Sequence, residues 1–228
     1  MVIDTEKQQG IARHVRLVIK GIPVFYWPYL RFPVGDKRQS GFLFPSITAD
    51  RENYSVALPY YFNLAPNYDL TFTPQVISNH GTLFELNGRH LSRSFATEIS
   101  LGHIGNDRDE LDEDDQDLVD AGTISEAEAR PYQDEDRWLV SVKQQGGVGR
   151  RWSSTIDYTE VSDNDYLRDF DNATLSTNSK TSLNQQIKAS YQFDHWQLGI
   201  NNQQYQTLSD SIAQPFKQLP QVLSLIHI

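Results

Sequence analysis

The chain has 228 residues and a formal net charge of −10, and it contains no cysteine. Disulfides, thiol chemistry and cysteine metal sites are therefore excluded from this stretch. Apolar residues make up 38% and aromatic residues 11%, and because aromatic side chains favour strands, the composition predicts an all-β chain. The charged first ten residues lack the core of a signal peptide, and no apolar run approaches the roughly 18 residues of a transmembrane helix. Any membrane contact is therefore expected from a β-barrel.

Residues 1–37 differ in pattern from the rest of the chain. One run is strand-like, with Ile11, Arg13, Val15, Leu17 and Ile19 on one face. An aromatic and proline-rich connector follows, and it is too irregular for a membrane strand. We expect this segment to be the end of a preceding domain.

Nine strands are predicted after residue 38 from a two-residue alternation of apolar and polar side chains. They lie near 40–48, 52–63, 67–78, 81–92, 95–104, 136–146, 150–160, 183–193 and 195–206. The connections near residues 66, 94, 149 and 194 are short, whereas those at 105–135 and 161–182 are long. Short turns at one end and long loops at the other are typical of an outer-membrane barrel. A soluble β-sandwich with a polar outer face is the alternative on this pattern alone.

Prolines fall inside the first predicted strands, although proline cannot donate to a sheet ladder. Pro66 is explained as a turn residue, and Pro74 lies near a predicted strand end. Pro59 follows Leu58 within a strand pattern and has no turn role. Its presence there requires a different explanation.

Charged side chains occur on the predicted polar face, which would line the lumen of a barrel. The candidates are Glu85, Arg89, Lys143 and Lys188. The plain interpretation is a solvated lumen in which the basic residues have Glu85 and Asp157 as neighbours. Attraction to a phosphorylated sugar is the alternative.

The negative charge is concentrated in residues 105–136, which hold fourteen acidic residues and two arginines. An EF-hand loop needs glycine at its sixth position and glutamate at its twelfth, but a loop starting at Asp107 has Asp112 and Leu118 there. That motif is rejected, and a solvated, flexible loop is predicted. The rest of the chain carries about +2 without a basic stripe, so no nucleic-acid partner is expected.

The histidines give no sign of a catalytic or metal site. His80, His90 and His103 have no metal-ligand spacing and form no triad with the scattered serines. We therefore assign no catalytic residue, no metal ligand and no cofactor.

Several strings, taken together, resemble one protein family. In order they are "GIPVFYWPYLRFPVGDKRQSGFLFP", "LPYYFNLAPNYDLTFTP", "NGRHLS", "RWLVSV", "DYTEVSDNDYLRDFDN" and "QLPQ". They resemble the outer-membrane lipopolysaccharide-assembly family LptD, also called OstA or Imp, from about Gly21 to Val222. Phe62 departs from the tryptophan usual in the family, and the acidic segment is individual. The resemblance implies the end of a periplasmic β-jelly-roll at 1–37 and the N-terminal part of a large, incomplete outer-membrane β-barrel at 38–222.

The resemblance also implies a function that is not enzymatic. The chain would be a fragment of a translocon that places lipopolysaccharide in the outer leaflet of a Gram-negative outer membrane, through the barrel lumen and a lateral gate. Pro45 and Pro59 match the family's prolines in the first two barrel strands, beside that gate. The implied partners are lipopolysaccharide, the lipoprotein plug LptE, the periplasmic bridge protein LptA and outer-membrane lipid. A porin or receptor-type barrel is the alternative, and an outer-membrane hydrolase comes third.

Two further expectations concern the acidic segment and the last residues of the chain. The acidic segment would be extracellular, and loose bridging by divalent cations to lipopolysaccharide phosphates is an alternative role for it. The last six residues, "LSLIHI" at 223–228, break the strand pattern and match the translation of a sequencing-adaptor end. We predict that these six residues are not biological.

Overall fold

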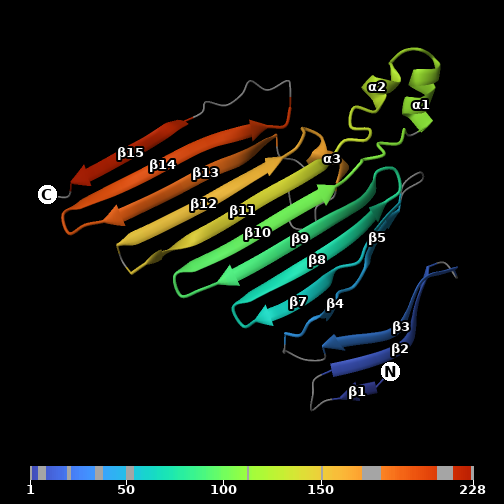
Figure 1. The fold of residues 1–228 in the computed structure, drawn as a ribbon, viewed down its shortest axis with the longest axis horizontal. Coiled ribbons are helices and arrows are strands. Elements are labelled where there is room, and N and C mark those ends of the chain that lie inside the picture. The colour runs from blue at the N-terminus through green and yellow to red at the C-terminus, as the bar shows by residue number, and fades with distance from the viewer. Residues whose placement is uncertain are drawn as a thin grey trace.

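A computed structural model describes residues 2–4, 9–19, 22–33, 38–49, 54–111, 113–149, 151–170, 181–209 and 218–226. Strands make up 63% of the structure and helices 8%. The strands form two antiparallel sheets, one small and one large (Figure 1). The prediction of an all-β chain is confirmed.

The small sheet contains β1 (Val2–Asp4), β2 (Gln9–Ile19) and β3 (Ile22–Pro33), in that order. The register of β2 and β3 runs from Gln9 opposite Pro33 to Ile19 opposite Ile22. The predicted connector is therefore largely a strand. Among the described strands β3 lies at the edge of this sheet, where prolines are tolerated because one row of ladder groups is not needed for pairing.

The large sheet contains the remaining strands. They are β4 (Gly41–Phe42), β5 (Ser46–Ala49), β6 (Tyr54–Ala57), β7 (Tyr60–Ala65), β8 (Tyr68–Ile77), β9 (Gly81–Leu91), β10 (Phe95–Ile104), β11 (Arg137–Val148), β12 (Trp152–Val161), β13 (Ser182–Gln192), β14 (Trp196–Thr207) and β15 (Gln218–Ile226). Consecutive strands pair from β8 to β15, while β6 and β7 both pair with β8, β5 pairs with β6 and β4 with β7. Within the described residues this sheet is open at both sides (Figure 1).

The predicted strands agree with this sheet in most places. The seven predicted between 67 and 206 correspond to β8–β14, with ends that differ by a few residues. The first two predicted strands are each divided in two, into β4 and β5 and into β6 and β7. An additional strand, β15, pairs with β14 as far as Ile226 opposite Trp196. It includes residues 223–226, whose origin stays a prediction.

The register gives the large sheet two chemically different faces. On the apolar face Phe72, Leu86, Leu101 and Val140 are direct cross-strand neighbours on β8–β11. The opposite face, called the polar face below, carries Asp69, Arg89, Glu98, Lys143 and Asp157. Side chains alternate between the faces of a strand, so the sequence pattern was a correct guide to this division.

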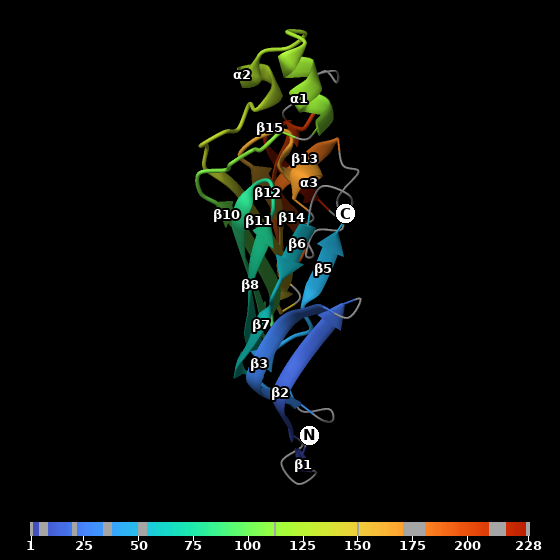
Figure 2. The ribbon, with the colours of Figure 1, turned by 90° about the vertical axis from the view of Figure 1, so that its right-hand side faces the viewer.

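The described parts of the two long connections, which include the helices, lie together at one end of the sheet, called the loop end below (Figure 2). The acidic segment forms α1 (Glu113–Asp120) and α2 (Glu126–Ala129), and α3 (Tyr166–Asp169) follows β12. The prediction of a flexible acidic loop missed this order. Local capping explains part of it, because Ser125 and Glu128 form a capping box at α2. None of the described helices is both long and apolar enough to cross a bilayer.

An apolar core fills the loop end. Its buried members are Ile77, Leu83, Ile104, Leu139, Val161, Tyr166, Leu167, Phe170 and Leu183. They come from β8–β13 and from α3, so α3 covers the polar face there. The five charged residues named above, Asp69, Arg89, Glu98, Lys143 and Asp157, lie outside this core.

Candidate functional site

The polar face carries a row of alternating charges. Asp69, Arg89, Glu98, Lys143 and Asp157 lie opposite one another on five successive strands, β8–β12. Opposite charges on directly facing residues stabilise a sheet, whereas like charges destabilise it. The row continues into uncharged amides, Gln186 on β13 and Gln203 on β14. We call these five charged residues the charge row.

Asp69 is the most buried member of the charge row, with 7% of its surface exposed. It accepts hydrogen bonds from Arg89 Nε at 2.9 Å and Nη2 at 3.0 Å, and the guanidinium of Arg38 contacts the same carboxylate. Arg38 also donates to the Pro66 carbonyl at 3.2 Å, and its own carbonyl accepts from Asn63 Nδ2 at 2.8 Å. These contacts fasten the chain before β4 to the β7–β8 turn.

The predicted polar-face residues differ in their surroundings. Arg89 and Lys143 belong to the charge row, and Lys188 is an exposed residue of β13 opposite Thr155 and Asn201. Glu85 was expected to line an open lumen, but only 6% of it is exposed. It lies opposite Gly102, in the region that α3 covers. The acidic neighbours of Arg89 are Asp69 and Glu98, and Glu85 is not among its direct partners.

Prolines interrupt the ladders between the first strands. The Pro59 carbonyl accepts from Leu43 N at 2.9 Å, and the Pro74 carbonyl accepts from Leu58 N at 3.0 Å. In an antiparallel ladder each such pair would exchange two hydrogen bonds. Proline has no N–H to return, so each pair keeps one bond. Pro74 lies inside β8 opposite Phe84.

Pro45 lies between β4 and β5, where the register of these strands with β7 and β6 changes. Phe42 faces Tyr60 in the β4–β7 pair, but Ser46 faces Ala57 in the β5–β6 pair. One extra residue is therefore accommodated between β4 and β5, as in a β-bulge. Pro45 lies between β4 and β5, Pro59 between β6 and β7, and Pro74 within the neighbouring strand β8. We call these three residues the proline row.

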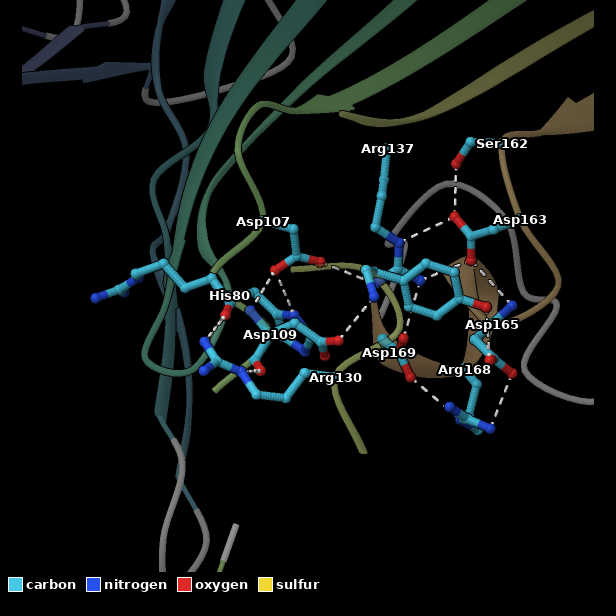
Figure 3. A network of polar contacts seen from close by, with 12 residues as sticks. His80, Asp107, Asp109, Arg130, Arg137, Ser162, Asp163, Asp165, Arg168 and Asp169 are labelled. Atoms are coloured by element: carbon cyan, nitrogen blue, oxygen red, sulfur yellow. Dashed lines mark hydrogen bonds and ion pairs between the residues drawn. The ribbon is translucent and has the colours of Figure 1, made fainter. Parts of the chain in front are cut away.

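A buried arginine lies at the centre of an ion-pair cluster at the loop end (Figure 3). Arg137, the first residue of β11, is 1% exposed. Its Nη1 donates to Asp107 Oδ2 at 2.9 Å, and its Nη2 donates to Asp169 Oδ2 at 2.9 Å. Nε and Nη2 bind the two oxygens of Asp163 at 2.9 and 2.7 Å. This fork geometry suits a guanidinium and not an ammonium group.

Aromatic rings and a histidine complete the cluster. The guanidinium carbon of Arg137 lies 4.1 Å from the ring centre of Tyr132 and 4.7 Å from that of Phe170, distances suited to cation–π attraction. His80 Nδ1 lies 2.8 Å from Asp107 Oδ1. We call Arg137, Asp107, Asp163, Asp169 and His80 the Arg137 cluster.

The cluster favours ionised carboxylates. Burial opposes the charge on Asp107, but hydrogen bonds with His80 and Arg137 outweigh it and lower the pKa of this carboxyl below its ordinary value. Burial also opposes the charge on Asp163, and the bonds from Arg137 and Ser162 again lower its pKa. Breaking such a buried pair is strongly destabilising, because it leaves an uncompensated charge.

Sequence reasoning did not find the Arg137 cluster, although it used the strings that contain three of its five residues. Arg137 opens "RWLVSV", and Asp163 and Asp169 belong to "DYTEVSDNDYLRDFDN". The available signal was the spacing of three aspartates at 163, 165 and 169. In the part of the chain that the structure describes, no His, Cys, Asp and Glu side chains gather as metal ligands. Arg137 is the cation that Asp107, Asp163 and Asp169 surround, whereas Asp165 pairs with Arg168.

Comparisons with known proteins give the family. A family profile described as "LptD: LPS transport system D" matches residues 135–224. The chain is 42% identical over 228 residues to the LPS-assembly protein LptD of Saccharophagus degradans, covering 99% of this chain and 26% of that protein. The same protein of Hahella chejuensis is 37% identical over 227 residues, with 97% and 26% covered, and that of Pseudomonas aeruginosa (strain LESB58) is 35% identical over 214 residues, with 93% and 21% covered.

These matches extend over nearly the whole chain but over a limited part of each relative. The chain spans about a quarter of the length of the two relatives first named, at 26% of each. The matched length includes both sheets and the segments that hold the charge row, the proline row and the Arg137 cluster. The chain belongs to the LptD family of LPS-assembly proteins.

Proposed function

We propose that this chain forms part of an outer-membrane translocon that delivers lipopolysaccharide to the outer leaflet. The large sheet would be the N-terminal part of a β-barrel, covering residues 38–222, and the small sheet the end of a periplasmic jelly roll within residues 1–37. The observation that carries the proposal is the combination, in one sheet, of an apolar face, a charged face and a proline row at one side. Lipid suits the first face and a hydrated lumen the second.

The charge row supports passage of a phosphorylated sugar. Arg89 and Lys143 each lie between two acidic residues of the row, so neither basic residue is an uncompensated site for a phosphate. Conduction requires binding that is weak enough to release the solute. A row of compensated charges meets that requirement, because it solvates the sugar without trapping it.

The proline row supports sideways release of the acyl chains. Pro59 and Pro74 each remove one ladder bond. The bond lost at Pro59 is toward Leu43, before β5, and the bond lost at Pro74 is toward Leu58, between β6 and β7. A hydrogen bond contributes about 0.5–1.5 kcal/mol to stability. Strands β4–β7, which lack these two bonds, would therefore separate from the sheet more easily than β9–β14. We propose that Pro45 and Pro59 form the lateral gate and that Pro74 belongs to the same weakened region.

Partners and location follow from the same proposal. Lipopolysaccharide would be the substrate, LptE would occupy the barrel lumen as a plug, and LptA would deliver the lipid to the jelly roll from the periplasm. The location is the outer membrane of a Gram-negative bacterium, with the apolar face against outer-membrane lipid. The role is transport and assembly without enzymatic chemistry.

A chimera provides the test of this function. Residues 1–222 replace the matching segment of the S. degradans relative, which supplies the rest of the protein, in a strain depleted of its own copy. Surface lipopolysaccharide and resistance to large hydrophobic antibiotics should be restored.

The same chimera tests the gate. Pro45→Ala combined with Pro59→Ala should slow delivery of lipopolysaccharide at equal amounts of folded barrel, while Pro66→Ala in the β7–β8 turn is the matched control. Unchanged delivery in the double variant would contradict a gate at these prolines.

The orientation of the barrel can be tested separately. If the short turns are periplasmic, the α1–α2 segment lies outside the cell. A cysteine in place of Thr123, an exposed residue between the two helices, should react with an impermeant thiol reagent on whole cells. A cysteine in place of Ser94, in the β9–β10 turn, should react only after lysis. The reverse pattern would invert the assignment.

A further inference from the structure

We propose that the Arg137 cluster positions the loop end of strand β6, and that it thereby controls how easily β5 and β6 separate from β8. This inference rests on the proposed gate, because separation of these strands matters for release of a lipid only if the first strands form one. It assigns a positioning role to residues at the loop end, none of which lies in the strands that contain the prolines.

The β5–β6 pair is weakly attached to the rest of the sheet. Its pairing with β8 extends over the three positions Ser55–Ala57, whereas β8 pairs with β9 along its whole length, Tyr68–Ile77. At the end of β6 nearer β7 the ladder with β8 is weakened, because Leu58 N donates to the Pro74 carbonyl but proline has no N–H to return. Few ladder bonds resist opening of such a segment, so any contact at its other end has a large relative effect.

The other end of β6 is attached to the β8–β9 turn. Ser78 N donates to the Tyr54 carbonyl at 3.0 Å. In return, Tyr54 N donates to Ser78 Oγ at 3.0 Å. Two hydrogen bonds therefore hold the first residue of β6 at a position just past the end of β8.

The β8–β9 turn is in turn held by the first residues of the acidic segment. Arg108 Nη2 donates to the Ser78 carbonyl at 2.9 Å. Arg108 N donates to the His80 carbonyl, and Glu110 N to the Asn79 carbonyl, both at 2.9 Å. Residues 107–110 thus run along the turn and bond to each of its three residues.

The Arg137 cluster fixes this strip of chain from the opposite side. Asp107 binds Arg137 and His80 through its two oxygens, and Arg130 Nη2 donates to the Arg108 carbonyl at 2.8 Å. Since Arg137 also binds Asp163 and Asp169, the β12–β13 connection is joined to the same point (Figure 3). A continuous series of hydrogen bonds therefore leads from three connections of the loop end to Tyr54.

This series predicts a local effect on strand separation. Loosening it removes bonds at the loop end of β6 and leaves the ladders of β9–β14 intact. A role in general stability would affect those ladders as well. Amide hydrogen exchange, which reports opening residue by residue, distinguishes the two roles.

The first test uses variants that leave the buried cluster in place. In the purified chimera, Ser78→Ala removes one bond to Tyr54, and Arg108→Ala removes the side-chain bond to Ser78. Arg108 is half exposed, so its removal leaves no buried charge. Each variant should speed exchange of the β6 amides about fivefold, the effect of one hydrogen bond, with β13–β14 unchanged. Arg151→Ala, which breaks an exposed pair with Asp194 at the short turns, is the control and should leave β6 unchanged.

The second test restores the attachment by another route. Val56 and Val76 face one another on β6 and β8, and directly opposed residues in an antiparallel pair lie within disulfide reach. With both replaced by cysteine and oxidised, the Arg108→Ala variant should regain slow exchange in β6. Reduction should remove this rescue.

Outcomes for the inference and for the proposed gate are separable. Unchanged exchange in β6 for both Ser78→Ala and Arg108→Ala would overturn the inference, whatever the protein transports. Faster exchange in β6 with unchanged delivery of lipopolysaccharide would confirm the coupling and contradict the gate.

Arg137→Lys extends the test to the centre of the cluster. Because this variant keeps the positive charge and loses the forked hydrogen bonds, it should speed exchange at residues 78–80 and in β6 together.

Discussion

At the scale of single residues, Gly102 shows how closely α3 packs against the sheet. A Cβ atom added at Gly102 would lie 2.4 Å from the Tyr166 hydroxyl oxygen, and Tyr166 is fully buried. Gly102→Ala must therefore displace the buried Tyr166 side chain, and overpacking of this kind costs about 1–3 kcal/mol. We expect a lower temperature of barrel unfolding in the chimera, measured by heat modifiability on gels. Gly88→Ala is the control, because its Cβ would meet Leu70 Cδ1 at 3.6 Å, an ordinary van der Waals contact; equal losses for both variants would contradict this explanation.

The carboxylates of the Arg137 cluster predict a pH dependence. The pKa values of Asp107 and Asp163 are lowered in the folded protein. Their contribution to stability is therefore complete above the ordinary pKa of about 3.9 and is lost as the pH falls through the lowered folded values. Protection of amides 106–109 from hydrogen exchange, corrected for intrinsic rates, should be constant from about pH 8 to about pH 5 and fall below about pH 4. Loss of this protection well above pH 5 would contradict the assignment.

At the scale of strands, Pro74 predicts how the weakened ladder responds to repair. Pro74→Val supplies an N–H opposite the Leu58 carbonyl, and one added bond should slow local exchange at Leu58 about fivefold. Local strand separation leaves most of the chain folded, so the entropy that proline removes from the unfolded state does not enter this comparison. If the proline row lowers the cost of opening, delivery of lipopolysaccharide should slow as well.

The control for this prediction is a proline that takes part in no ladder. Pro66 lies in the β7–β8 turn, and Pro66→Ala should leave exchange at Leu58 unchanged. Faster exchange at Leu58 in the Pro74→Val chimera would show that the row is a tolerated irregularity. It would then have no part in strand separation.

At the scale of the whole molecule, the features that could be predicted from the sequence are those set by residues close together in the chain, namely the strands and the two faces of the sheet. Alternation of side chains is local, so β8–β14 could be predicted to within a few residues, and with them the face of Arg89 and Lys143. The strand β15 contains Pro220, which weakened the pattern there. The Arg137 cluster could not be predicted in this way, since its aspartates lie 26 to 32 residues from Arg137. Their meeting depends on the register of the sheet and on the path of two long connections.

The open sheet predicts how the isolated chain behaves. Within the described residues the large sheet ends at β15 on one side and at β4 and β5 on the other, and edge strands present ladder groups that no neighbour satisfies. In lipid each unsatisfied group costs several kcal/mol, and in water such edges associate with one another. We therefore expect the 228-residue chain alone to form oligomers or aggregates in detergent, measured by size exclusion with light scattering, whereas the chimera supplies partners for both edges and forms a heat-modifiable barrel. A monodisperse, protease-resistant monomer of the isolated chain would mean that the two edges pair with each other or are covered by other parts of this chain, and the large sheet would then have to be described as a closed domain of its own.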